Sequence, residues 1–83
     1  MTVSEMDLAI IYSNRTQECD RAIALLKFME HKYIEYLIDV DFTHSQFVKE
    51  FGEQAEYPQV AIGTHHIGSL KDTLHYFEYS GKL

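Results

Sequence analysis

The stretch that decides the fold is YPQVAIGTHHIGS, residues 57–69. It contains two short runs, PQVAIG (58–63) and HHIG (65–68), which meet at the turn residues Gly63 and Thr64. Short runs bounded by glycine and proline are typical of strands, and a tight connection between two of them makes a hairpin. The stretch therefore predicts two antiparallel strands.

The segment that follows, Ser69 to Tyr79, predicts a helix. Ser69 and Asp72 have the spacing of a capping box, in which each side chain bonds the backbone amide of the other residue. The side chains expected to face the core are Leu70, Leu74, Phe77 and Leu83.

Two strand and helix pairs precede the hairpin. The runs DLAIIYS (Asp7–Ser13) and KYIEYLIDV (Lys32–Val40) predict strands. Between them, from Thr16 to His31, apolar residues recur at spacings of three and four, which predicts a helix with one buried face. The Thr16 hydroxyl is expected to cap its N-terminus. A further helix is predicted to begin after Thr43, which forms a capping box with Gln46, and to stop at Gly52.

The predicted order of elements is β-α-β-α-β-β-α, in one α/β domain that covers residues 1–83. Two strands joined through a helix should be parallel, with a right-handed crossover. The expected result is a four-stranded mixed sheet with three helices. Lys32–Val40 lies at one edge, and Asp7–Ser13 lies between it and the strand that starts at Pro58.

Composition excludes several classes of protein. The formal net charge is −6, and lysine and arginine form no cluster, so nucleic acid and anionic membranes are not expected as partners. No apolar run approaches the roughly 20 residues of a membrane span, and MTVSEMDLAI lacks the basic start of a signal peptide. The single cysteine excludes an internal disulfide. A cytoplasmic protein is therefore expected.

The chain resembles the glutaredoxin family of the thioredoxin fold, from AIIYSN (residues 9–14) to YFEYSGKL (residues 76–83). CDRAIALL (19–26) is similar to the helix after the second cysteine of the family's C-P-Y-C motif. YPQVAIGTHHIGS is similar to the family's T-V-P-Q-V-F-I-x-x-x-x-I-G-G block, and SGKL (80–83) is similar to its common chain end. The resemblance implies a thioredoxin-like fold and glutathione-linked thiol–disulfide exchange.

By this resemblance the active site is TQEC, residues 16–19, in place of C-P-Y-C. Cys19 falls on the second, resolving cysteine and Thr16 on the first, nucleophilic one. A threonine hydroxyl cannot replace a thiolate as nucleophile, because its pKa lies far above that of a thiol. Relatives with one active-site cysteine can hold an iron–sulfur cluster, but they do so through the first cysteine, which this chain lacks, so no cluster is expected here.

The resemblance also implies a weak glutathione site. Its residues would be Arg15, Tyr57, Pro58, Ser69 and Leu70. A cis bond is expected before Pro58, so that the Tyr57 backbone faces an extended peptide. Leu70 and Lys71 replace the polar pair that holds the γ-glutamyl end in the family, and Ser69 replaces a glycine. Binding is therefore expected to be weak, with the helix N-terminus favouring a carboxylate.

Several residues allow two interpretations. Cys19 is either a redox thiol that the helix N-terminus activates or a buried structural thiol, and the second is more common for such a residue. The acidic neighbours Glu18 and Asp20 oppose a thiolate. Adjacent residues on a strand point to opposite faces, so His65 and His66 cannot chelate one metal ion, and no metal is expected.

Two functional hypotheses follow. The first is a glutathione-linked, glutaredoxin-like thiol–disulfide oxidoreductase whose atypical active site has Cys19 alone. The alternative is a non-catalytic binding module that recognises an extended protein segment by strand addition, at a groove beside Tyr57-Pro58 that Tyr12 also flanks. Threonine at position 16, in place of the nucleophilic cysteine, favours the binding module.

Overall fold

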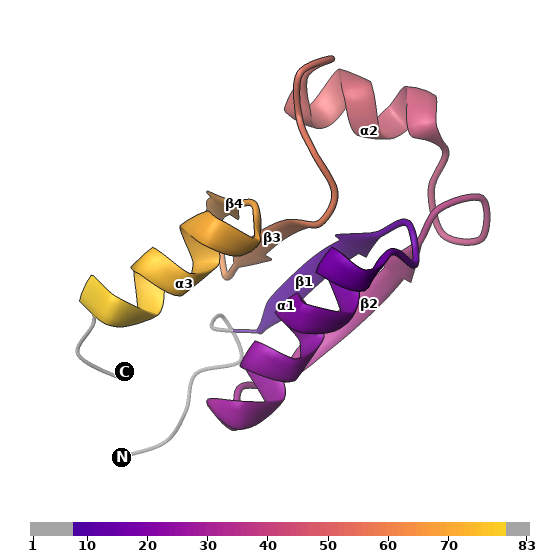
Figure 1. Ribbon diagram of the computed structural model, residues 1–83. Helices are drawn as coiled ribbons and strands as arrows, with labels where there is room; N and C mark the ends of the chain where they lie inside the picture. Colours follow the sequence, from indigo (N-terminus) through magenta and orange to yellow (C-terminus); the bar gives the residue numbers. More distant parts are fainter. Residues whose placement is uncertain (1–7, 80–83) are drawn as a thin grey trace.

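The computed structural model describes residues 8–79. The chain forms seven elements in the predicted order (Figure 1). They are β1 (Ala9–Ser13), α1 (Gln17–Phe28), β2 (Tyr33–Leu37), α2 (His44–Phe51), β3 (Gln59–Ile62), β4 (His65–Gly68) and α3 (Leu70–Tyr79). Asp7 and Leu83, which the sequence places in the first strand and in the core, lie outside the described residues.

The four strands form one mixed sheet in the order β2-β1-β3-β4. β1 pairs in parallel with β2, with Ala9 opposite Tyr33, and antiparallel with β3, with Ala9 opposite Ile62. β3 and β4 form the predicted antiparallel hairpin around the turn at Gly63-Thr64. The predicted fold, with β2 at one edge, is therefore confirmed.

The core lies between the sheet and the two helices α1 and α3, which cover the same face of it (Figure 1). The alternation of β1 turns Ala9 and Ile11 into this core. Its buried members are Ala9, Ile11, Ala22, Leu26, Val60, Ile62 and Phe77. The expectation that Leu74 faces inward is wrong: its side chain is 39% exposed, because it lies on the rim of the surface between the two helices.

Helix α1 ends three residues before the predicted His31, for a local reason. Glu30 adopts a left-handed backbone conformation, with φ 55°. Its amide then donates to the Lys27 carbonyl, and the His31 amide donates to the Leu26 carbonyl. This pair of bonds is the Schellman arrangement, which closes a helix by satisfying its last carbonyl groups.

Strand β2 also ends early, at Leu37 instead of Val40. Asp39 has φ 66°, and the amides of Val40 and Asp41 both donate to the Leu37 carbonyl, so the chain turns there. The turn leads into α2, whose capping box between Thr43 and Gln46 is formed as predicted. At its other end Gly52 has φ 98°, a conformation that favours glycine, and the helix stops.

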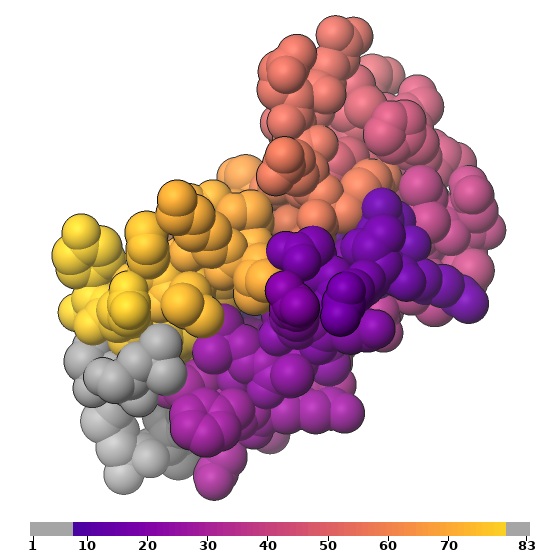
Figure 2. Space-filling view, in the orientation of Figure 1, coloured from indigo at the N-terminus to yellow at the C-terminus, as the bar shows by residue number. Residues whose placement is uncertain are grey.

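Helix α2 stands beyond one end of the sheet instead of lying over it (Figure 1). In the space-filling view, α2 and the segment that returns from it to β3 form a raised lobe (Figure 2). Phe47 is the one buried residue of this helix. None of the described helices is long and apolar enough to cross a membrane.

Candidate functional site

The start of α1 holds a small polar network built on Asn14. The Thr16 hydroxyl donates to Asn14 Oδ1 at 2.8 Å, and the Cys19 thiol donates to the same oxygen at 3.3 Å. Thr16 Oγ1 lies 3.5 Å from Cys19 Sγ, as expected for residues three apart at the start of a helix. The structure therefore brings together the two residues that the sequence assigns to the active site.

The predicted capping role of the Thr16 hydroxyl is wrong. Thr16 does occupy the N-cap position, with φ −85° and ψ 169°, but its side chain caps no backbone amide. The physical reason is competition, because the Asn14 amide oxygen attracts the hydroxyl away from the helix. Only the backbone carbonyl of Thr16 bonds the first turn, accepting from the amides of Cys19 and Asp20.

Cys19 is fully buried, with no exposed side-chain surface. Thr16, by contrast, is exposed, and Asn14 is half-buried. A buried thiol cannot attack a disulfide in solution without a change in its surroundings, because the two sulfur atoms must touch. In this conformation the accessible group at the helix start is therefore the Thr16 hydroxyl.

The Tyr57-Pro58 peptide bond is cis, as predicted. Pro58 is fully buried, while the Tyr57 ring stacks on Phe47 at a centroid distance of 4.0 Å. The Tyr57 hydroxyl lies 3.1 Å from His44 Nδ1. Burial raises the pKa of Tyr57, and electrostatic interactions with Asp39 and then Cys19 raise it further. The last of these causes places Tyr57 beside the start of α1.

The start of α3 is held by the predicted capping box. The Ser69 amide and hydroxyl both donate to Asp72 Oδ2, at 3.1 and 3.0 Å, and the Asp72 amide donates back to Ser69 Oγ. A side chain at Gly68, where φ is 124°, would collide with the Asp72 carboxylate. The chain thus fills part of its own carboxylate-binding site, since the Ser69 amide is already taken by an acidic side chain.

The capping box predicts a pH dependence of stability. Hydrogen bonds from the Ser69 backbone and then its side chain lower the pKa of Asp72 below its usual value of 3.8, with smaller contributions from His75 and Lys71. A lowered pKa means that the ionised group stabilises the folded state at neutral pH. This stabilisation should be lost as the pH falls below about 4 and through the lowered pKa.

The measurement is urea unfolding between pH 2 and pH 7. Asp72→Asn keeps a neutral acceptor, so its free energy of unfolding should fall less steeply in acid than that of the unchanged protein. Ser69→Ala removes the hydroxyl donor and should give an intermediate slope. Equal slopes for Asp72→Asn and the unchanged protein would contradict the prediction.

A groove of about 380 Å³ runs between α1 and α3. Leu70, from the predicted glutathione site, lines it together with Lys71. The opposite wall comes from α1, where Glu18 and Arg21 form an exposed ion pair at 3.4 Å. The groove therefore joins the first turns of the two helices that carry the candidate site.

Other predicted residues lie apart from this groove. Arg15 is exposed with a left-handed backbone at φ 65°, and its guanidinium forms no hydrogen bond or ion pair with the other described residues. Tyr12 packs on the face of the sheet opposite to α1 and α3. Its ring centroid lies 5.3 Å from that of Phe42, whose ring in turn stacks on Tyr57. The two tyrosines thus belong to one aromatic cluster instead of flanking one groove.

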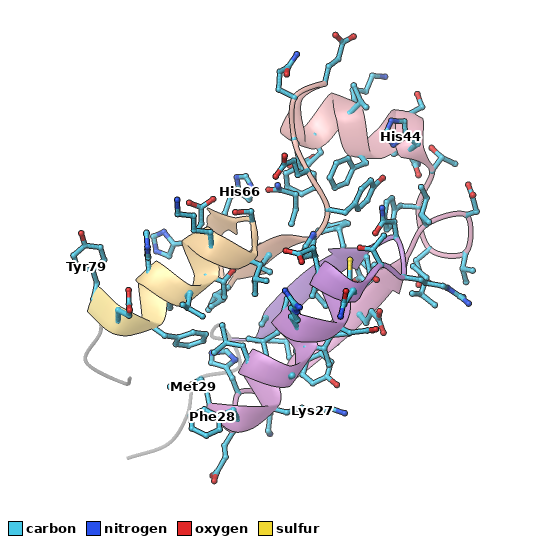
Figure 3. The ribbon with its side chains drawn as sticks, in the orientation of Figure 1. Lys27, Phe28, Met29, His44, His66 and Tyr79 are labelled. Atoms are coloured by element: carbon cyan, nitrogen blue, oxygen red, sulfur yellow. The ribbon has the colours of Figure 1, made fainter. Side chains whose placement is uncertain are left out.

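His65 and His66 are both exposed, and Figure 3 labels His66 on β4. His66 Nε2 lies 2.6 Å from Gln59 Oε1, and its ring packs 4.8 Å from the Phe51 ring. No three His, Cys, Asp or Glu side chains within residues 8–79 are grouped as a metal ion would require.

Sequence reasoning missed three contributors to the site. Asn14 bonds both Thr16 and Cys19. His44, at the start of α2 (Figure 3), and Phe47, one turn further on, contact the Tyr57 side chain. The asparagine-to-threonine spacing of two residues is a known signal for a local side-chain bond. The link from α2 to Tyr57 spans ten or more residues and has no local signal in the sequence.

Comparison with solved structures finds a similar chain, whereas comparison with family models and with curated proteins finds none. Among solved structures, the solution structure of glutaredoxin from Brucella melitensis is similar, with a TM-score of 0.71 and 29% sequence identity. The match covers 95% of this chain and 86% of that one. The chain has the glutaredoxin-type thioredoxin fold, and this likeness supports a place among the glutaredoxin and thioredoxin-like redox proteins.

Proposed function

We propose that the protein binds glutathione or an extended, cysteine-bearing segment of another protein, at the surface between the starts of α1 and α3 and the Tyr57-Pro58 bond. The resemblance to glutaredoxins implies ligands of this class, and we propose that this protein recognises them without rapid exchange. The residues that would contact the ligand are Arg15, Thr16, Tyr57, Pro58, Ser69 and Leu70.

One observation carries this proposal: the only cysteine of the sequence is fully buried, while a groove is open between the starts of α1 and α3. The cis bond before Pro58 and the start of α3 are both formed. Lys71 lines the same groove as Leu70, and its ammonium group suits a carboxylate of the ligand. Recognition without rapid exchange is therefore the function that the geometry supports best.

Thiol–disulfide exchange by Cys19 is the second candidate. The observation in its favour is that Cys19 Sγ lies 3.5 Å below the exposed Thr16 hydroxyl, so one side chain separates it from the surface. In such a reaction the Cys19 thiolate would attack one sulfur of glutathione disulfide. A mixed disulfide would form and a glutathione thiolate would leave. A thiolate of a second protein would then attack the glutathione sulfur of this mixed disulfide, so that the glutathionyl group passes to that protein and the Cys19 thiolate leaves.

The test of the binding function is titration with reduced glutathione, followed by amide chemical shifts. We expect weak, saturable binding, with shifts concentrated at residues 15–18, 57–60 and 68–72. Lys71→Glu should weaken binding roughly two- to five-fold, the usual range for one exposed charge pair. Lys49→Glu makes the same charge change on α2 and should leave the affinity unchanged. No shifts at millimolar glutathione would refute the proposal.

The two candidates separate in a reaction with glutathione disulfide. Intact mass before and after incubation reports whether Cys19 has gained one glutathione. We expect little modification of the folded protein and full modification in urea, because burial protects the thiol. Rapid modification of the folded protein, abolished in Cys19→Ser, would favour the exchange reaction instead.

A further inference from the structure

A second cavity lies away from the glutathione surface, where the turn after β2 and helix α2 meet the end of the sheet. Its volume is about 240 Å³. We call it the aromatic–acidic pocket. Its lining residues are Tyr12, Tyr36, Asp41, Phe42, Gln46, Phe47, Glu50 and Phe51.

Aromatic rings make up most of this lining. Tyr12 is the central ring and packs against Tyr36, Phe42 and Phe51, at centroid distances of 5.5, 5.3 and 5.0 Å. These contacts hold the rings in fixed positions around the cavity. The face of an aromatic ring attracts a cation, most strongly where water is excluded.

The polar residues of the pocket add negative charge. Asp41 and Glu50 are both exposed at its rim, and the lining includes no lysine, arginine or histidine among the described residues. Asp41 is held in place because its Oδ2 accepts from the Leu37 amide at 2.9 Å. Burial raises the pKa of Tyr12, and electrostatic interactions with Tyr36 and then Glu50 raise it further. The last interaction places the Glu50 carboxylate close to the Tyr12 phenol.

Size and surroundings indicate what kind of molecule carries the cation. The cavity is smaller than the roughly 300–1,000 Å³ of sites that hold drug-sized ligands, so it suits one side chain. Beside it, Ile34 on the edge strand β2 is 42% exposed and shares a sheet face with Tyr36, two residues on. An exposed apolar residue next to a cation pocket matches a protein segment better than a free ion.

We propose that the aromatic–acidic pocket receives the guanidinium group of an arginine on a partner protein, with the residues beside that arginine resting on Ile34. Arginine fits better than lysine because its planar group stacks on aromatic faces and is more weakly hydrated. Its fork of N–H donors can also bond a carboxylate at the rim. The protein's net charge of −6 would favour the approach of a basic partner.

The probe is the acetylated tripeptide amide valine-arginine-valine, titrated while the ring and amide signals of Tyr12, Tyr36 and Glu50 are followed. We expect saturable shifts there. The same peptide with citrulline, which has the shape of arginine without its charge, should bind at least five-fold more weakly. Spermidine tests the other source of a cation, and binding as tight as that of the arginine peptide would overturn the assignment to a protein partner.

Two variants with the same change of charge complete the test. Glu50→Gln should weaken binding of the arginine peptide roughly two- to five-fold, because Glu50 lines the pocket. Glu53→Gln lies outside the lining and should leave the affinity unchanged. Equal effects of the two variants, equal binding of the citrulline peptide, or no shifts at millimolar peptide would each overturn the proposal.

Discussion

Replacing Thr16 with cysteine should create a protein that forms an internal disulfide with Cys19 and gains thiol–disulfide exchange activity. The unchanged protein has one thiol and can form no such bond. The expected change is therefore from no internal disulfide to one per molecule, together with a gain of exchange activity over the unchanged protein. It is the direct test of the hypothesis that Thr16 occupies the place of the family's nucleophile.

The geometry at the start of α1 favours this outcome. Thr16 Oγ1 already lies 3.5 Å from Cys19 Sγ, so a sulfur at that position needs only a small movement to reach bonding distance. The new thiol would be exposed at the N-terminus of a helix, where backbone amides stabilise a thiolate. The acidic Glu18 and Asp20 in the first turn oppose that stabilisation and should limit the rate.

The substitution should leave the fold intact. The Thr16 hydroxyl caps no backbone amide, so the variant loses the bond to Asn14, worth about 0.5–1.5 kcal/mol, and the 3.5 Å contact of the hydroxyl with the Cys19 sulfur. The sequence predicted that the Thr16 hydroxyl caps the helix, in which case the substitution would also have removed a helix cap. Thermal unfolding of the reduced variant checks it.

Thiol counting and intact mass after mild oxidation measure the disulfide, and a glutathione-coupled assay measures exchange. Gln17→Cys is the matched control, because residues two apart on a helix do not face each other. It should keep two free thiols or link between molecules. If Thr16→Cys behaves in the same way, the assignment of Thr16 to the nucleophile position is wrong.

The arrangement of the sheet was predictable because it rests on local signals. The hairpin is marked by Pro58 and by the Gly63-Thr64 turn, and the parallel pair by a helix of sufficient length between two apolar runs. The two predicted capping boxes, Thr43 with Gln46 and Ser69 with Asp72, each join residues three apart, and both are formed. Signals of this kind need no knowledge of the rest of the molecule.

The ends of two elements depended on backbone conformations without a glycine. Glu30 and Asp39 take left-handed conformations, with φ 55° and 66°, and end α1 and β2 before the predicted residues. Glycine is the usual signal for such a stop, and neither position has one. The bounds predicted from the sequence for α1 and β2 were therefore too long at their C-terminal ends.

The candidate site was predicted in its parts but not in its chemistry. The capping patterns predicted the starts of α1 and α3, and the resemblance placed the candidate site there. A buried structural thiol was the favoured interpretation of Cys19, and the structure buries it, but the contacts that cover it could not be predicted. Burial depends on how Asn14 and Thr16 fold over the thiol, through bonds that compete with a helix cap. The aromatic–acidic pocket was also missed, because its walls come from residues 12 to 51 and meet only in the folded chain.

Replacing Phe47 with alanine should cost about 3–5 kcal/mol of unfolding free energy, the usual range for a buried phenylalanine. Phe47 is 2% exposed and is the one buried residue of α2. Its ring stacks on Tyr57 at 4.0 Å and packs against Phe51 at 5.0 Å. A chain of this length has a total stability of only about 4–12 kcal/mol, so the loss should bring it close to unfolding.

Phe28→Ala is the matched control, since it removes the same side chain from a site that is 76% exposed, and it should change stability by less than about 0.5 kcal/mol. Urea unfolding measures both variants. Equal, small effects would mean that α2 is not anchored through Phe47.

The position of Phe47 also links the lobe to both sites, because it supports Tyr57 on one side and lines the aromatic–acidic pocket on the other. At low urea, where the variant is still folded, amide exchange should therefore accelerate in α2 and at residues 57–60 together, while β1 stays protected. Faster exchange in α2 alone would show that the Tyr57 segment is held independently of the lobe.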